Sequence, residues 1–102
     1  MSNPSGTSAK WTIRWSSPAE AAMRKTLDHI FLQDPFAAAM VKKRLTAALD
    51  VISLQPNIGT PARTKSTRRF PIPKTGHVIE YRFAGNQVVI TRWARHAQVR
   101  KL

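Results

Sequence analysis

Two helix-start signals of the same kind follow each other in the first half of this chain of 102 residues. Ser17 can cap a helix that begins at Pro18, and Glu20, three positions after Ser17, completes a capping box. Asp34 and Pro35 repeat the combination of an acceptor side chain followed by proline. The sequence therefore predicts two consecutive helices, and this constrains the fold more than any other feature.

The apolar residues after each start signal recur at helical spacing. In the first helix, which we expect to end at about Leu32, they are Met23, Leu27, Ile30 and Phe31. In the second, which we expect to end before Pro56, they are Val41, Leu45, Ala48 and Ile52. Because the link between the helices is short, we expect them to form an antiparallel hairpin.

Segments in which side-chain character alternates lie on both sides of this hairpin and predict strands. They are residues 10–16 before the hairpin and residues 63–69, 77–83 and 87–93 after it. Ala84-Gly85-Asn86 is a hairpin turn signal, and Pro71 and Pro73 belong at a sheet edge or an irregular exit. The predicted class is α+β. An N-terminal strand precedes an antiparallel helical hairpin, which packs on a curved antiparallel sheet of about four strands (β-α-α-β-β-β).

The length favours one domain, which we place at residues 10–98. Residues 1–9 read as a flexible N-terminal segment and residues 99–102 as a basic tail. We expect no membrane partner, because no apolar run approaches the roughly 20 residues that span a bilayer. Cysteine is absent, which suits a reducing compartment, so we expect the protein in the cytoplasm.

The charge is strongly positive and unevenly distributed. Seventeen Lys and Arg residues stand against five Asp and Glu residues, a net charge of +12. After residue 55 the chain has ten basic side chains and only one acidic one, Glu80. Such a field attracts phosphates or acidic proteins, so the second half predicts a docking surface for a polyanion or an acidic partner. The alternative is a surface that serves solubility alone.

The composition restricts the chemistry that the chain can perform. The histidines are scattered and cysteine is absent, so we expect no metal site and no cofactor. Neither a nucleophile elbow nor a glycine-rich phosphate loop occurs. What remains is a metal-free ribonuclease, in which cations stabilise the phosphorane and a His, Lys or Tyr moves protons.

His96 and Tyr81 each have a catalytic and a structural interpretation. His96 lies between Arg95 and Arg100, and cationic neighbours favour the neutral imidazole that can accept a proton. The alternative for His96 is a tail residue that caps a carbonyl. For Tyr81 the alternative is a half-buried strand residue with its hydroxyl at the rim.

The second half also shows a resemblance to a known family. Four segments carry it: Pro56 to Pro61, Thr67 to Phe70, His77 to Phe83, and Val88 to His96. In order and spacing they resemble the ParE/RelE superfamily of type II toxin–antitoxin modules, closer to the ParE-like branch, over about residues 10–98. The resemblance implies a growth-arresting toxin that a cognate antitoxin neutralises.

The superfamily implies one of two activities. ParE-like members poison DNA gyrase without being known as nucleases, whereas RelE-like members cleave mRNA on the ribosome. Of the RelE-type cationic positions, only Arg69 keeps a suitable charge here. Val78, Pro71 and Gln98 occupy the others, and no tyrosine follows Gln98. This departure favours the gyrase poison. The ribonuclease alternative would use Arg69, Tyr81, Arg95 and His96, and a general nucleic-acid-binding or degenerate toxin module is a third interpretation.

We assign two sets of binding residues on this basis. Residues for the target, gyrase or alternatively the ribosome with its mRNA, are Arg63, Lys65, Arg68, Arg69, Lys74, Arg82, Arg92, Arg95, His96 and Arg100. Residues for the antitoxin, in a groove between the helical hairpin and the sheet edge, are Phe36, Met40 and Leu54. An acidic or amphipathic antitoxin segment that folds on binding would suit this surface.

Overall fold

Two helices and a five-stranded sheet make up the described part of the chain, which in this computed structural model is residues 10–62, 64 and 66–96. Strand β2 (Thr12–Trp15) precedes helices α1 (Ser17–Gln33) and α2 (Pro35–Leu54). The 3-10 turn η1 (Pro56–Ile58) then leads into β3 (Thr60–Pro61), β4 (Thr67–Ile72), β5 (His77–Ala84) and β6 (Gln87–Arg95). The α+β class and the order of elements confirm the prediction.

The sheet differs from the prediction in two details. Its strand order is β2-β6-β5-β4-β3, so it has five strands rather than about four. The N-terminal strand β2 pairs in parallel with β6, while all the other pairs are antiparallel. Because the helical hairpin carries the chain from β2 back across the sheet, β2 can align with the last strand in the same direction.

Both helix starts have an acceptor side chain and a proline in the first turn. Asp34 caps α2 as expected, and its carboxylate accepts a hydrogen bond from the Ala37 N–H at 3.1 Å. The cap of α1 is Ser16 rather than Ser17, since the Ser16 hydroxyl accepts from the Ala19 N–H at 3.3 Å. Two serines in a row offer the same hydroxyl, and the earlier one holds the extended backbone that a cap requires.

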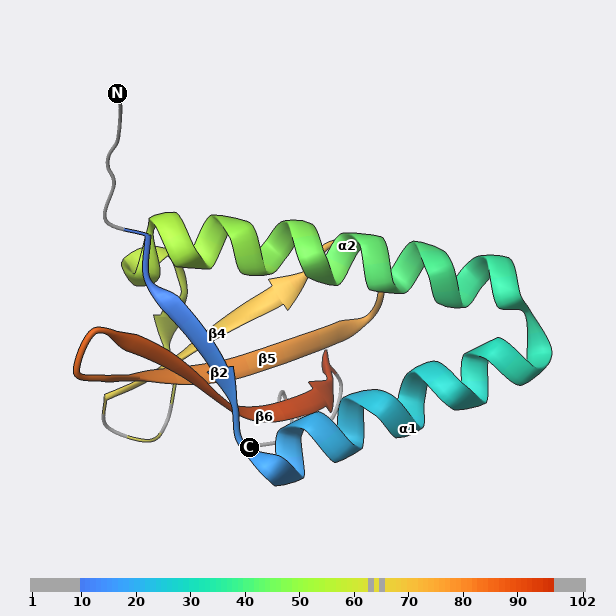
Figure 1. Ribbon diagram of the computed structural model, residues 1–102, viewed down its shortest axis with the longest axis horizontal. Helices are drawn as coiled ribbons and strands as arrows, with labels where there is room; N and C mark the ends of the chain where they lie inside the picture. Colours follow the sequence, from blue (N-terminus) through green and yellow to red (C-terminus); the bar gives the residue numbers. More distant parts are fainter. Residues whose placement is uncertain (1–9, 63, 65, 97–102) are drawn as a thin grey trace.

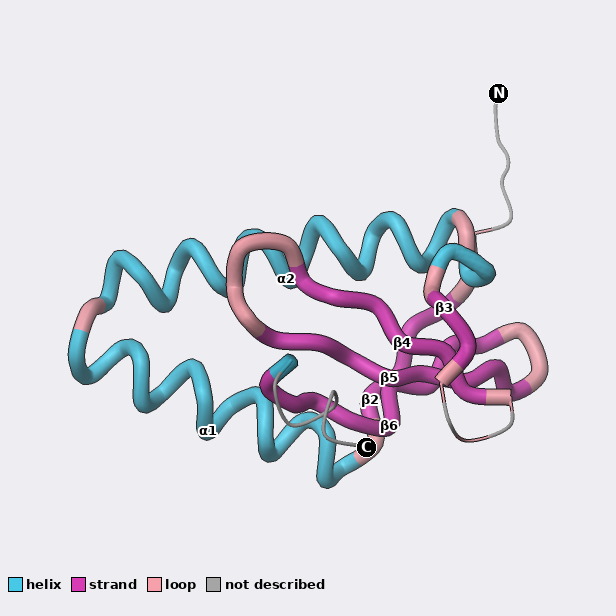
Figure 2. The backbone as a smooth tube through the Cα atoms, turned by 180° about the vertical axis from the view of Figure 1, so that it is seen from behind, coloured by secondary structure: helices cyan, strands magenta, loops and turns pink. Residues whose placement is uncertain are grey.

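The helical hairpin covers one face of the sheet, and its closed end extends beyond the strands (Figures 1 and 2). The predicted stripe Val41, Leu45, Ala48 and Ile52 is buried. These residues share a core with Ile79, Tyr81, Val88, Ile90 and Trp93 of the sheet. Within the described residues, neither helix is long and apolar enough to cross a membrane.

A β-bulge in the β5–β6 pair determines which side chains meet on the face of the sheet opposite the helices, here called the outer face. The register shifts between Glu80 and Tyr81, so Glu80 pairs with Arg92 and Tyr81 pairs with Ile90. Thr91 is the extra residue, and its hydroxyl donates to the Glu80 carbonyl at 3.3 Å. The bulge keeps Ile90 in the core and places Arg92 across from Glu80.

Candidate functional site

Three strands bring two arginines and one glutamate into a row across the outer face. Arg69 of β4 pairs with Glu80 of β5, which pairs with Arg92 of β6. Directly paired residues project from the same face of a sheet. Glu80 is 8% exposed, and its carboxylate lies 3.8 Å from Nη1 of Arg92. Nε of Arg69 is buried without a hydrogen-bond partner among the described residues.

Arg82 extends this cationic surface toward the β5–β6 turn. It pairs with Thr67 and Val89, and its side chain is exposed. No ion pair or side-chain hydrogen bond of Arg82 occurs within the part of the chain that the structure describes. Arg69, Arg82 and Arg92 are called the outer-face arginines below. Of these three, Arg82 is the most available to a partner.

The remaining predicted target residues lie elsewhere. Lys74 lies in the β4–β5 turn, and its carbonyl accepts from Arg44 at 3.4 Å. Arg95 and His96 are exposed at the end of β6, where the His96 N–H donates to the Gly76 carbonyl at 2.9 Å. Apart from Arg68, the predicted cations that the structure describes therefore form one group on the outer face and another at the β4–β5 turn. Arg63, Lys65 and Arg100 fall outside the described residues.

Tyr81 and Arg68 both bind the loop that follows α2. The Tyr81 hydroxyl is buried, donates to the Pro56 carbonyl at 2.6 Å and accepts from the Gly59 N–H at 3.0 Å. Nη1 of Arg68 donates to the carbonyls of Asn57 and Gly59. Burial raises the pKa of Tyr81, although the Gly59 bond and the charge of Arg68 oppose the rise. Both side chains thus hold η1 against the sheet.

The predicted antitoxin residues do not share one groove. Phe36 and Leu54 are 75% and 65% exposed, but they lie at opposite ends of α2, about 27 Å apart at 1.5 Å per residue. Met40 is half-buried. A hollow of about 440 Å³ lies between the helices instead, and Leu27, Phe31, Ala38 and Lys42 are among the residues lining it. Together with Leu32, which is 84% exposed, Phe31 and Phe36 make the hairpin end apolar.

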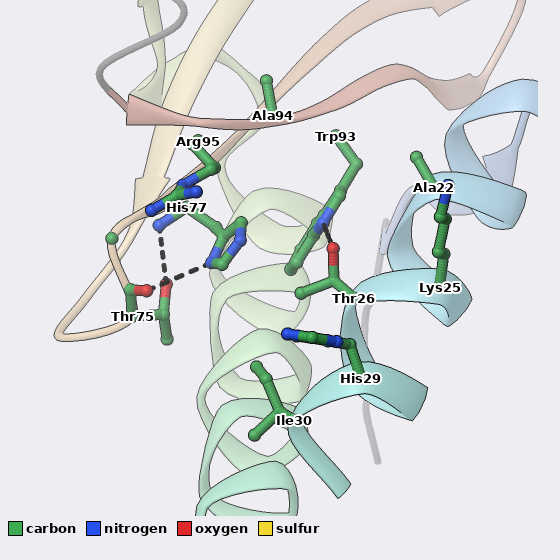
Figure 3. Close-up of a pocket in the computed structure, with 11 residues that line it drawn as sticks. Ala22, Lys25, Thr26, His29, Ile30, Thr75, His77, Trp93, Ala94 and Arg95 are labelled. Atoms are coloured by element: carbon green, nitrogen blue, oxygen red, sulfur yellow. Dashed lines mark hydrogen bonds between the residues drawn. The ribbon is translucent and has the colours of Figure 1, made fainter. Parts of the chain in front are cut away.

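A second hollow opens where α1 faces the start of β5 and the end of β6. It measures about 680 Å³ and is called the α1–sheet cleft below. In Figure 3, Thr26 and His29 extend from α1 toward Trp93 and His77 of the strands, while Lys25 lies along α1 beside Ala22 and Arg95 lies beside His77. The His77 ring stacks on Trp93 at a centroid distance of 4.9 Å, and the Trp93 indole N–H donates to the Thr26 hydroxyl at 3.0 Å.

Sequence reasoning assigned no function to this cleft, because its residues are far apart in the chain. His29 and His77 come together only through the packing of α1 on β6. The signal available in the sequence was the β5–β6 hairpin, which sets His77 opposite Arg95 and Ile79 opposite Trp93. The bulge moves this register by one residue, so counting from the turn would have given the wrong partners.

The ionisation of His77 depends on its position inside this cleft. Burial lowers the pKa of His77, the hydrogen bond with the Thr75 carbonyl opposes this, and the charge of Arg95 lowers the pKa further. A carbonyl only accepts, so Nδ1, which lies 3.1 Å from the Thr75 oxygen, carries the proton of the neutral ring. The neutral His77 therefore presents Nε2 as an acceptor.

This lowered pKa predicts that stability falls in mild acid. Below the ordinary histidine pKa of about 6.5, the unfolded chain binds more protons than the folded one, so stability rises with pH in this range. The contribution of His77 to the free energy of unfolding is complete above pH 6.5 and is lost as the pH falls toward the pKa of His77 in the folded protein. The free energy of unfolding in urea, measured at about pH 5.5 and pH 7.5, should differ less between the two pH values for His77→Gln than for the parent protein. The exposed His29, changed to Gln, is the control, and equal effects of the two substitutions would contradict the assignment.

Comparison with known proteins places the chain in a family. Residues 13–100 match the family model described as the ParE toxin of the type II toxin–antitoxin system parDE. A candidate toxin of Sinorhizobium fredii, Y4kP, is 33% identical over 86 residues, which cover 84% of this chain and 90% of that protein.

The fold agrees with this placement. A chain of the chromosomal ParDE toxin–antitoxin system from P. aeruginosa superposes with a TM-score of 0.75 at 18% identity, covering 85% of this chain and 97% of that chain. At this identity the superposition supports the fold alone, while the family model covers nearly the whole described chain. The protein therefore belongs to the ParE toxin family of type II toxin–antitoxin systems.

Proposed function

We propose that this toxin inhibits DNA gyrase, and so arrests growth until a cognate antitoxin neutralises it. Family membership implies the target, and the outer-face arginines supply a surface for it. Arg82 in particular is exposed and has no ion pair within the described residues. A cationic face of this kind attracts an acidic protein surface or the DNA held by the enzyme.

The observation that favours inhibition by binding over ribonuclease catalysis is the separation of the four catalytic candidates. The Tyr81 hydroxyl is buried and already engaged at Pro56 and Gly59. Arg69 pairs with Glu80, and Arg95 pairs with His77. Glu80 and His77 are three residues apart on β5, so Arg69 and Arg95 are separated by about 10 Å along the strand direction. A proton-transfer group must lie within hydrogen-bond reach of the reacting atoms, and these residues share no such point.

The ribonuclease alternative retains Arg95 and His96, which are exposed together at the end of β6. The two functions differ in what fails first after induction of the toxin. Gyrase inhibition predicts relaxed plasmid DNA while mRNA stays intact. Mapping of 5′ ends by primer extension would instead reveal new cleavage sites if the ribonuclease were correct.

Antitoxin binding is proposed to use the apolar end of the hairpin, including Phe36. Replacing Phe36 with Asp should abolish rescue by the co-expressed antitoxin and leave growth arrest intact, because a buried carboxylate would lack a partner at the interface. Ile58→Asp changes another exposed apolar side chain, on η1, and serves as the control. Growth curves with and without antitoxin provide the measurement. Full rescue of the Phe36 variant by the antitoxin would exclude the apolar end of the hairpin as the antitoxin-binding site.

A further inference from the structure

The α1–sheet cleft is distinct from the outer face of the sheet and from the hairpin end. Two walls from different parts of the chain form it, α1 on one side and the β5 start with the β6 end on the other (Figure 3). At about 680 Å³ it falls within the roughly 300–1,000 Å³ typical of small-molecule sites. Its size therefore suits a ligand much larger than a single inorganic ion.

The charged and titratable side chains among the described residues that line this cleft are cationic or neutral. Lys25 and His29 come from α1, and His77 and Arg95 come from β5 and β6. No Asp or Glu occurs among the described residues that line it. Lysine, arginine and protonated histidine donate charge-assisted hydrogen bonds, which are strong toward phosphate oxygens. The positive charge of the cleft therefore favours the binding of an anionic ligand.

The walls are held in place by hydrogen bonds that do not require a ligand. Trp93 donates to Thr26 at 3.0 Å and so joins β6 to α1 at the cleft. The Thr75 hydroxyl donates to the Ile72 carbonyl at 2.8 Å and accepts from the His77 N–H at 3.1 Å. A site whose walls are already ordered loses less conformational entropy when a ligand binds.

The cleft also has an apolar part beside its cations. Ala22 and Ile30 of α1 contribute to one wall, and the Trp93 ring contributes to the other, whereas the Ala94 side chain points away from the cleft (Figure 3). A ligand that fits this combination has a flat apolar portion joined to an anionic one. A bare phosphate would satisfy the cations but leave the apolar walls uncovered.

We propose that the α1–sheet cleft binds a nucleoside phosphate, either as a free nucleotide or at the end of a nucleic-acid strand. The phosphate lies against Lys25 and His29, which stand one helical turn apart on α1, and the base lies against Trp93 on the opposite wall. Nε2 of the neutral His77 accepts a hydrogen bond from a sugar hydroxyl or an amino group of the base, because phosphate oxygens only accept. This site goes beyond gyrase inhibition and does not depend on it.

The test is a nuclear magnetic resonance titration of the whole protein with adenosine monophosphate, adenosine and inorganic phosphate. The Trp93 indole N–H, which is bonded to Thr26, is the reporter inside the cleft. The monophosphate should shift this signal with a dissociation constant of about 1 mM or lower, and the other two probes should bind about tenfold more weakly. An oligonucleotide with a terminal phosphate distinguishes a strand end from a free nucleotide.

Lys25→Ala is the decisive variant, because its side chain is exposed on α1 and alanine preserves the helix. It should weaken binding of the monophosphate about fivefold to tenfold. Lys43→Ala removes an exposed lysine from α2 and is the matched control, which should bind as the parent does. Equal affinities of the two variants, phosphate binding as tightly as the monophosphate, or no shift of the Trp93 signal would each overturn the proposal.

Discussion

Replacing Gly59 with alanine is expected to destabilise the protein by about 2–5 kcal/mol, a large fraction of the roughly 5–15 kcal/mol that stabilises a typical domain. The added Cβ would lie 2.7 Å from the Tyr81 hydroxyl and 2.9 Å from the Arg69 carbonyl. The Gly59 backbone has a φ of −69°, which any residue can adopt. The cost therefore comes from lack of space rather than from backbone strain.

Displacement of Tyr81 would add a second cost. Its hydroxyl satisfies the Gly59 N–H and the Pro56 carbonyl, and losing a buried partner costs about 1–3 kcal/mol. Tyr81→Phe removes only the hydroxyl, so its effect should be smaller than that of Gly59→Ala. Unfolding by urea measures all variants, with the exposed neighbour changed in Thr60→Ala as the control. If Gly59→Ala is as stable as Thr60→Ala, the claim that Tyr81 packs too closely on Gly59 to leave room for a Cβ is contradicted.

The second large effect is functional, and it comes from reversing one outer-face arginine. Arg82→Glu should abolish growth arrest while leaving the fold intact, because Arg82 is exposed and makes no ion pair within the described residues. The substitution changes the charge where we expect the target to bind. Like charges facing each other across an interface cost several kcal/mol, which at about 1.4 kcal/mol per tenfold would weaken binding a hundredfold or more.

The control for this prediction is Lys43→Glu, which makes the same change in net charge on the exposed side of α2. It should remain fully toxic. Colony counts after induction measure the effect, and circular dichroism shows that both variants are folded. If both variants lose toxicity equally, net charge rather than the outer face determines activity.

The helical hairpin could be predicted from the sequence because its determinants are local. Capping side chains, prolines in the first turn and apolar spacing act within a few residues, and Asp34 and the stripe on α2 were identified correctly. The exact cap of α1 could not be chosen, since Ser16 and Ser17 have the same side chain. The pairing of β2 depends on residues over 70 positions away, which no local pattern specifies.

The candidate site was less predictable, because the function of a polar side chain depends on what lies against it. The sequence made Arg68 a target-binding residue and Tyr81 either a catalytic or a half-buried residue, and the structure shows both bound to the loop after α2. Arg92 faces Glu80 only because of the bulge at Thr91. The cleft containing His29 and His77 requires the hairpin, the sheet and their packing together.

Inhibition of gyrase in a purified system tests the central claim most directly. Gyrase supercoils relaxed plasmid in the presence of ATP, and the parent toxin and Lys43→Glu should block this reaction while Arg82→Glu does not. Primer extension on mRNA from induced cells should show no new 5′ ends. Undisturbed supercoiling by a toxin preparation that still arrests growth would contradict the account, and new 5′ ends would assign the toxin to the ribonuclease branch instead.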